Sequence, residues 1–252
     1  ESGEERFTQA EKDFMIQKYK DLKTPFYYEY MDGWAALLQN ISTFILMLAL
    51  VIGFLVSGIF SDEFQTKADS IFFSARFGRS RGISAKIGSG FCIITGFYLM
   101  FVFLYTFIVL FVLGADGASC PIQLDLWRSV YNITFLQAYL FIVFGGYIGT
   151  VFASTLAMIV SALTYSTPTA VIVPFIVLCA FPFLSKIITL PGLCSFFPDQ
   201  LLEIYLDIKE AGLITLGSKV TTIATVIVPV YTVVCLIFQP ILYRVYQKVE
   251  IK

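Results

Sequence analysis

Charged residues occur in clusters along the chain and leave four long stretches without any charge. These uncharged stretches are residues 33–60, 87–115, 129–185 and 220–243. A helix needs roughly 20 mainly apolar residues to cross the hydrocarbon core of a bilayer. Three of the stretches therefore predict one membrane-spanning helix each, and the stretch 129–185 is long enough for two.

The break inside the longest stretch is predicted at residues 165–168. Pro168 has no backbone amide hydrogen and disfavours helical geometry at Thr167. Pro174 and Pro182 interrupt the span that follows, so we expect a broken helix whose freed backbone is covered by protein or by a cavity. The five predicted spans are 35–60, 87–113, 133–164, 169–184 and 220–243.

Composition agrees with a membrane protein. Of the 252 residues, 58% are hydrophobic and 14% are charged, and the mean hydropathy is +0.81. A soluble domain is about a quarter charged, so lipid is needed to cover part of this apolar surface. The predicted fold class is an all-α integral membrane protein, a polytopic helical bundle. The net charge of −1 offers no basic field for nucleic acid, which is not expected as a partner.

Lysine and arginine are distributed unevenly among the segments that join the spans. Segment 61–86 carries five of them and residues 244–252 carry three, whereas segment 114–128 carries only Arg128. By the positive-inside rule, segment 61–86 and the C-terminus face the cytoplasm. Five spans then place residues 1–32 on the external side of the membrane. We expect this mixed-charge tail to end a larger external domain, with residues 33–252 forming the transmembrane domain.

Segment 187–219 is predicted to lie outside, between the last two spans. Residues 187–198 are uncharged but too few to cross, and residues 199–210 are amphipathic. We interpret the segment as a short re-entrant or interfacial hairpin; an external loop with one surface helix is the alternative. The two helical faces of 199–210 carry Glu203, Asp207 and Glu210, and Leu201, Ile204 and Ile208.

The chain lacks the residue types on which several kinds of membrane-protein chemistry depend. The chain has no histidine, and none of the predicted spans contains an acidic or basic residue. Ion-coupled carriers, pumps and membrane metalloenzymes build their sites from such groups. Phosphate-binding glycine loops and nucleophile–base pairs are also lacking, so catalysis, a metal or a cofactor is not expected in this chain. Cys120 and Cys194, both predicted outside, are either paired or free, and their spacing does not decide.

The third predicted span carries a small residue at every fourth position. Such a ridge allows another helix to approach closely. The partner helix lies either in this subunit or in a second copy, and packing within the subunit is favoured. The ridge consists of Gly145, Gly149, Ala153, Ala157 and Ser161.

Segment 61–82 predicts a capped helix followed by a basic turn. Ser61 or Asp62 caps its N-terminus, and Gly78 ends it. One apolar face of this helix must pack against a partner or against the bilayer. A basic loop that only fixes the topology is the simpler alternative. The apolar face consists of Ile71, Phe72 and Phe73.

The pattern of segment 61–86 resembles the permease subunits of ABC type-2 exporters. In that family an acidic residue follows a span, a short helix and a basic position come next, and an Ala-Lys pair enters the following span. The family's six-span plan, with both termini cytoplasmic, also fits if its first span precedes residue 1. The corresponding residues are Glu63, residues 71–76, Arg79 or Arg81, and Ala85-Lys86, with Phe77-Gly78 where the family often has proline.

The resemblance implies that the transport path and ATP hydrolysis belong to separate chains. Two permease chains form the path, and a dimer of separate cytosolic ABC ATPases binds ATP and magnesium. The expected cargo is amphipathic or hydrophobic, such as a peptide, a drug or a lipid-linked molecule, and the expected location is a bacterial plasma membrane. The residues expected to couple this chain to the ATPase are Glu63, Ile71, Phe72, Phe73, Arg76, Arg79 and Arg81.

Two other functions stay open. An ATP-independent channel or carrier would not co-purify with an ATPase. A non-transporting scaffold or sensor subunit would leave transport intact when the chain is lost.

Overall fold

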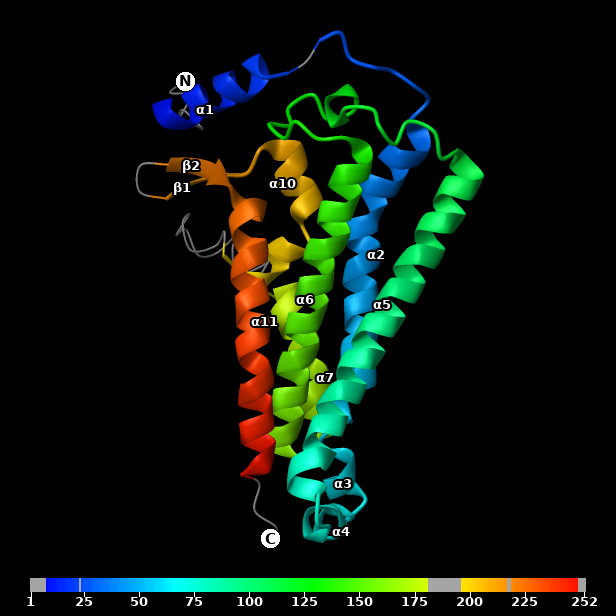
Figure 1. Cartoon of the computed structure of the whole chain (residues 1–252), viewed down its shortest axis with the longest axis vertical. Helices are drawn as coiled ribbons and strands as arrows, with labels where there is room; N and C mark the ends of the chain where they lie inside the picture. The colour runs from blue at the N-terminus through cyan, green and yellow to red at the C-terminus, as the bar shows by residue number, and fades with distance from the viewer. Residues whose placement is uncertain (1–7, 23, 181–195, 217–218, 249–252) are drawn as a thin grey trace.

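The computed structural model describes residues 8–22, 24–180, 196–216 and 219–248. Within these ranges, four helices are long and apolar enough to cross a membrane, and they run along the length of the molecule (Figure 1). This arrangement is a helical bundle of the kind expected for an all-α membrane protein. The four helices are α2 (Asp32–Ser57), α5 (Ile83–Leu113), α6 (Phe135–Thr164) and α11 (Ile223–Gln247).

The four long helices coincide with four of the five predicted spans to within a few residues at each end. The remaining predicted span, 169–184, begins as α7 (Thr167–Phe175) and continues through the π-helical turn η3 (Ile176–Ala180). Residues 181–184, the rest of that predicted span, lie outside the described residues. The break at 165–168 is confirmed, because α6 ends where Tyr165 adopts a left-handed conformation with φ 54°.

The connections divide between two ends of the bundle. The lower end in Figure 1 holds α3 (Asp62–Gln65), α4 (Asp69–Ser74) and the end of α11. The upper end holds α1 (Gln9–Lys20), residues 114–134 and α10 (Ile204–Glu210). Segment 61–86 and residues 244–248 thus share one end of the bundle. That this end faces the cytoplasm stays a prediction.

The end of α6 and the start of α11 lie at opposite ends of the bundle. Helix α7 begins at the lower end, where α6 finishes, whereas α11 begins at the upper end (Figure 1). Residues 165–222 therefore return the chain to the upper end.

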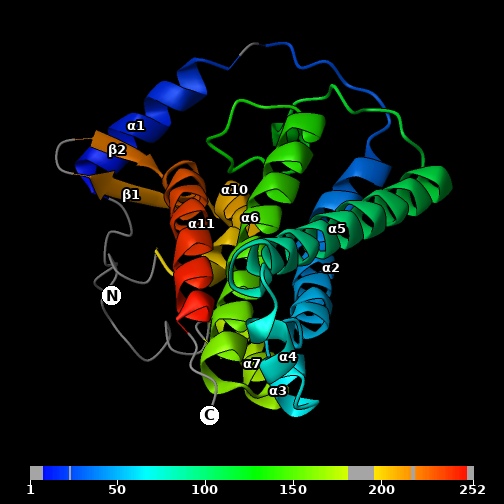
Figure 2. The ribbon, with the colours of Figure 1, turned by 60° about the horizontal axis from the view of Figure 1, so that its bottom comes forward.

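Helix α6 lies at the centre of the bundle and α5 at its edge. Most of α6 is buried, whereas most of α5 is exposed, and α5 leans away from the other helices (Figure 2). Phe103, Phe107 and Phe111 form an exposed row along α5. A membrane provides the apolar surroundings that such a row requires.

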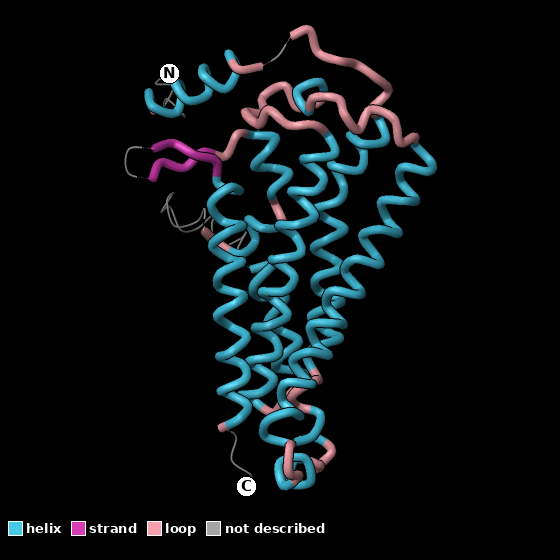
Figure 3. Tube along the Cα trace, viewed as in Figure 1, coloured by secondary structure: helices cyan, strands magenta, loops and turns pink. Residues whose placement is uncertain are grey.

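The upper end contains a β-hairpin that the sequence did not predict. Strands β1 (Leu213–Leu216) and β2 (Lys219–Thr222) pair antiparallel, as the magenta segments of Figure 3 show. Their pairing occupies residues 220–222, so α11 begins at Ile223 rather than at residue 220.

The amphipathic stretch 199–210 is not one continuous helix. It forms the 3-10 turn η4 (Pro198–Leu201) and then α10. Its apolar face is confirmed, since Leu201, Ile204 and Ile208 are buried. Residues 187–195 of the predicted re-entrant segment lie outside the described residues, as does Cys194, while Cys120 is buried.

Candidate functional site

The polypeptide between α2 and α5 folds into several short helical turns rather than the single capped helix predicted. Helices α3 and α4 are separated at Lys67, which has a φ of 57°. The Ser61 side chain does not cap α3, because its Oγ bonds Thr167 Oγ1 at 2.6 Å instead. Helix α4 already ends at Ser74. Gly78 therefore does not end the helix as predicted.

Gly78 instead begins the π-helical turn η1 (Gly78–Gly82) that leads into α5. A Cβ atom at this position would overlap the carbonyl oxygen of Phe72. Only glycine allows the backbone of η1 to approach α4 this closely. The tight approach keeps segment 61–82 folded back on itself at the lower end.

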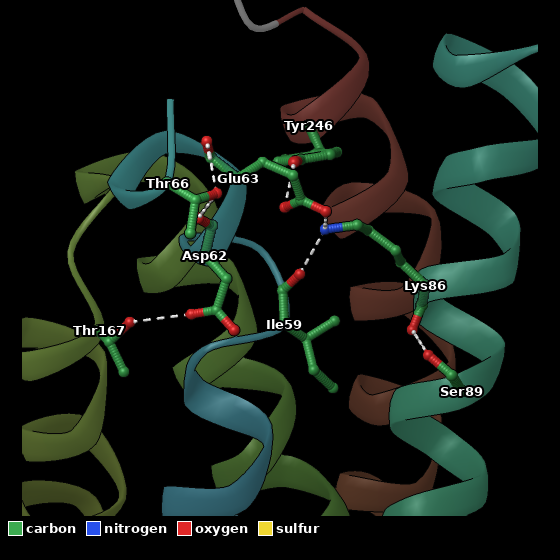
Figure 4. Close-up of polar contacts among 8 residues, drawn as sticks. All are labelled: Ile59, Asp62, Glu63, Thr66, Lys86, Ser89, Thr167 and Tyr246. Carbon is green, nitrogen blue, oxygen red and sulfur yellow. Dashed lines mark hydrogen bonds and ion pairs between the residues drawn. The ribbon is translucent and has the colours of Figure 1, made fainter. Parts of the chain in front are cut away.

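An ion pair joins the beginning of segment 61–82 to the helix that follows it. Glu63 on α3 pairs with Lys86 on α5, and Lys86 Nζ also donates to the Ile59 carbonyl oxygen at 2.5 Å (Figure 4). The Tyr246 hydroxyl of α11 donates to Glu63 Oε2 at 3.4 Å. The side chains of Glu63 and Lys86 are only 20% and 15% exposed, so water and salt screen their attraction weakly. The pair therefore links α3, α5 and α11.

Three aromatic rings surround the Lys86 ammonium group. Its Nζ lies 5.5 Å from the ring centroid of Phe60, 5.2 Å from that of Phe72 and 5.5 Å from that of Tyr246. Cation–π attraction at such distances stabilises a desolvated ammonium by about 0.5 to 2 kcal/mol per ring. Phe72 therefore packs within this chain.

Phe73 is buried as well, with 5% of its surface exposed. It packs against Phe64 and Tyr246, and the Arg79 guanidinium lies 4.9 Å from its ring centroid. Arg79 also donates to the Gln247 carbonyl oxygen at 3.0 Å, at the end of α11. Arg79 thus fastens segment 61–82 to α11.

The prediction that Ile71, Phe72 and Phe73 form one exposed apolar face is wrong. Ile71 is 74% exposed, Phe72 is half-buried and Phe73 is buried. Consecutive residues of an α-helix point about 100° apart, so three in a row cannot share a face on α4.

A different set of residues points outward from the lower end. Phe77 is 47% exposed, and the guanidinium groups of Arg76 and Arg81 lie 5.3 and 4.8 Å from its ring centroid. Sequence analysis missed Phe77, although its position between arginines was visible. We name Ile71, Arg76, Phe77 and Arg81 the outer surface of the segment.

The segment also contacts the junction of α6 and α7. Gln65 Nε2 donates to Thr167 Oγ1 at 2.8 Å, next to the Ser61 contact. The Phe64 ring lies 4.1 Å from that of Tyr165. Figure 2 shows α3 and α4 beside α7. Segment 61–82, which continues from α2, thus contacts the ends of α5, α6, α7 and α11.

The small-residue ridge of α6 lies in the interior of the bundle. A Cβ at Gly145 would overlap the Ile204 side chain, and a Cβ at Gly149 would lie 3.2 Å from Leu201 Cβ. The upper part of the ridge therefore packs against η4 and α10 of the same chain. Its other members, Ala153, Ala157 and Ser161, are fully buried.

A polar cluster at the upper end joins three segments. Asp207 Oδ2 of α10 accepts hydrogen bonds from the Tyr131 hydroxyl at 2.8 Å and from the Ala224 amide at 2.9 Å. Asp207 Oδ1 is buried and has no partner among the described residues. Burial raises the pKa of the Asp207 carboxyl to about 6, against the opposing effect of these hydrogen bonds. The amphipathic pattern placed Asp207 on a charged face of residues 199–210. The structure instead buries most of its side chain in this polar cluster.

This raised pKa predicts that stability falls as pH rises. The folded chain holds the Asp207 proton up to about pH 6, whereas the unfolded chain releases it near 3.8. The stabilising contribution is therefore complete below pH 4 and lost by about pH 6, a loss of up to about 3 kcal/mol. We expect Asp207→Asn to flatten this part of a thermal-unfolding profile measured in detergent from pH 4 to 8.

The control for this measurement is Asp116→Asn, which changes an exposed carboxyl at the same end. It should keep the pH profile of the unaltered chain. Equal slopes for the Asp207 and Asp116 variants between pH 4 and 6 would contradict the assignment.

No protein-family model, curated protein or solved structure matches this chain. Among the described residues, no group of three or more His, Cys, Asp or Glu side chains is placed to hold a metal ion. The molecule is thus a helical membrane protein in which segment 61–82 and the ends of α5, α6, α7 and α11 form a junction at one end of the bundle. Its function is inferred from that junction.

Proposed function

We propose that this chain is the membrane-spanning permease subunit of an ATP-driven exporter. Segment 61–82 would couple it to a separate cytosolic ABC ATPase. The observation that carries the proposal is that this one segment is fastened to the ends of α5, α6, α7 and α11 and is continuous with α2. A force applied to segment 61–82 would therefore reach all five helices together.

The two sides of the segment suit this role differently. Its inner side is held by the Glu63–Lys86 ion pair and by Phe72 and Phe73. A loop that only fixes topology does not require such rigid attachment, whereas transmission of force does. Its outer surface presents the exposed Ile71, and Phe77 beside two guanidinium groups. Aromatic and arginine side chains of this kind dominate protein contacts, so the surface suits an ATPase groove with an apolar centre and an acidic rim.

The remaining partners follow from the resemblance described above. A second permease chain would complete the path, and ATP and magnesium would bind to the ATPase. The exposed apolar row of α5 and the uncharged spans suit lipid contact and an amphipathic or hydrophobic cargo.

The test is an Ile71→Asp/Phe77→Asp double variant. Both side chains are exposed, so we expect the chain to fold normally. Charge against an apolar groove should weaken ATPase binding at least about tenfold, since buried anchors at an interface commonly contribute more than 1.4 kcal/mol. Binding is measured by pull-down of the ATPase from detergent, with cargo-stimulated ATP hydrolysis measured beside it.

Trp127→Asp is the matched control, because it places a charge on an exposed aromatic residue at the opposite end. It should leave binding and hydrolysis unchanged. If the double variant also retains both, segment 61–82 is only a topogenic loop, and the channel or scaffold functions take precedence.

A further inference from the structure

A cavity of about 560 Å³ lies toward the upper end of the bundle, between α2, η3, η4 and α10. Its size falls within the range of small-molecule sites in proteins. Its wall is mainly apolar: Leu46 comes from α2, Leu178 from η3, Leu206 from α10, and Leu202 directly follows η4. The cavity is separate from the junction at the lower end.

Two buried polar atoms in the cavity wall have no hydrogen-bond partner among the described residues. One is Asp199 Oδ1, in a residue with only 2% of its surface exposed, and the other is Ser42 Oγ on α2. The second carboxylate oxygen of Asp199 accepts from Gln200 Nε2 at 3.3 Å. Buried polar atoms are nearly always satisfied in native proteins. Two unsatisfied polar atoms in residues that line one cavity are consistent with a donor supplied by a bound molecule.

The face of α2 toward the cavity is polar although it belongs to a predicted span. Gln39, Ser42 and Thr43 lie three and four residues apart and line the cavity together. Polar groups at membrane depth are placed against protein or a cavity rather than against lipid. This pattern supports a cavity that receives a ligand with a polar part.

The charges in the wall favour a cation. Asp199, Glu203 and Lys209 line the cavity, so carboxylates outnumber ammonium groups among the described lining residues. Burial raises the pKa of Asp199, against the opposing effect of hydrogen bonds from the Asp199 and Gln200 backbone amides and the Gln200 side chain. A protonated amine has several N–H donors and a positive charge, and it forms charge-assisted hydrogen bonds with a carboxylate.

We propose that this cavity binds an amphipathic amine, whose ammonium group donates to Asp199 Oδ1 and Ser42 Oγ while its apolar part packs against the leucines. The proposal rests on the proposed function only in treating the bound molecule as cargo. Binding itself requires no ATPase.

The experiment uses the full chain in lipid nanodiscs and three fluorescent probes with the same dansyl group. Dansylcadaverine carries an amine, dansyl-pentylamide is neutral, and dansyl-aminohexanoate carries a carboxylate. We expect the amine to bind at least about tenfold more tightly than the neutral probe, as a charge-assisted hydrogen bond predicts. Asp199→Asn should reduce amine binding to the neutral level without changing neutral binding, and Ser42→Ala should weaken amine binding severalfold.

Two further variants keep the test decisive. Asp116→Asn, at an exposed site outside the cavity wall, should change nothing. Leu46→Trp leaves Asp199 in place but fills the cavity, so it should weaken both the amine and the neutral probe. If Asp199→Asn lowers the yield of folded protein, Leu46→Trp still shows whether the probes bind in this cavity.

Equal binding of the amine and neutral probes to the unaltered chain would overturn the proposal. An amine preference that survives Asp199→Asn in folded protein, or binding that Leu46→Trp does not affect, would overturn it as well. These failures leave the ATPase pull-down unaffected. The cavity and the exporter function can therefore fail independently.

Discussion

Replacing Lys86 by methionine is expected to cost about 2 to 4 kcal/mol of stability and to uncouple α3 from α5. The substitution removes the partner of Glu63 but leaves its side chain largely buried, with only the Tyr246 hydroxyl as a described donor to the carboxylate. Breaking a buried ion pair on one side is strongly destabilising, because the remaining charge is left uncompensated. The measurement is thermal unfolding in detergent, together with cargo-stimulated ATP hydrolysis by the assembled complex.

The Glu63→Gln/Lys86→Met double variant should recover part of the lost stability, because it removes the isolated charge. The four proteins of this cycle measure the interaction between the two residues. Stimulated hydrolysis should stay low in the double variant, since the link between α3 and α5 is not restored. Lys67→Met, in the same segment but exposed, is the control. Unfolding temperatures that do not distinguish Lys86→Met from Lys67→Met would show that the ion pair is not structural.

The second large effect is expected at the centre of the bundle. Gly149→Leu must place a side chain where a single Cβ already lies 3.2 Å from Leu201 and 3.3 Å from Leu202. Overpacking of a filled interior costs about 1 to 3 kcal/mol or more, and here it would push η4 away from α6. We expect loss of the monodisperse peak in size-exclusion chromatography, or a clearly lowered unfolding temperature.

Two further substitutions serve as controls for Gly149→Leu. Gly149→Ala should be mild, because shifts of a few tenths of an ångström accommodate a methyl group at these distances. Gly96→Leu is the matched control, since nothing lies within 4 Å of a Cβ at that position of α5. If Gly149→Leu is tolerated as well as Gly96→Leu, the α6 ridge does not pack as described.

The sequence alone determined the positions of four long helices and the break near Pro168. Both are local properties: membrane insertion depends on the summed transfer free energy of about 20 consecutive residues, and proline restricts its own neighbourhood. The small-residue spacing that begins at Gly145 likewise predicted close packing. It did not determine the partner, which the structure places in η4 and α10 of this chain.

The tertiary structure decided which side chains meet. Glu63 and Lys86 were both visible in the sequence pattern, but their pairing depends on how segment 61–82 folds back, and Tyr246 joins them from 183 residues away. The pattern treated Ile71 and Phe73 as one face, whereas two helical steps of about 100° each turn them to nearly opposite sides of α4. The hairpin that precedes α11 brings Ala224 to Asp207, which the amphipathic pattern had assigned to solvent. Contacts between distant residues depend on the packing of whole elements, so hydrophobic periodicity could locate these elements but could not pair their side chains.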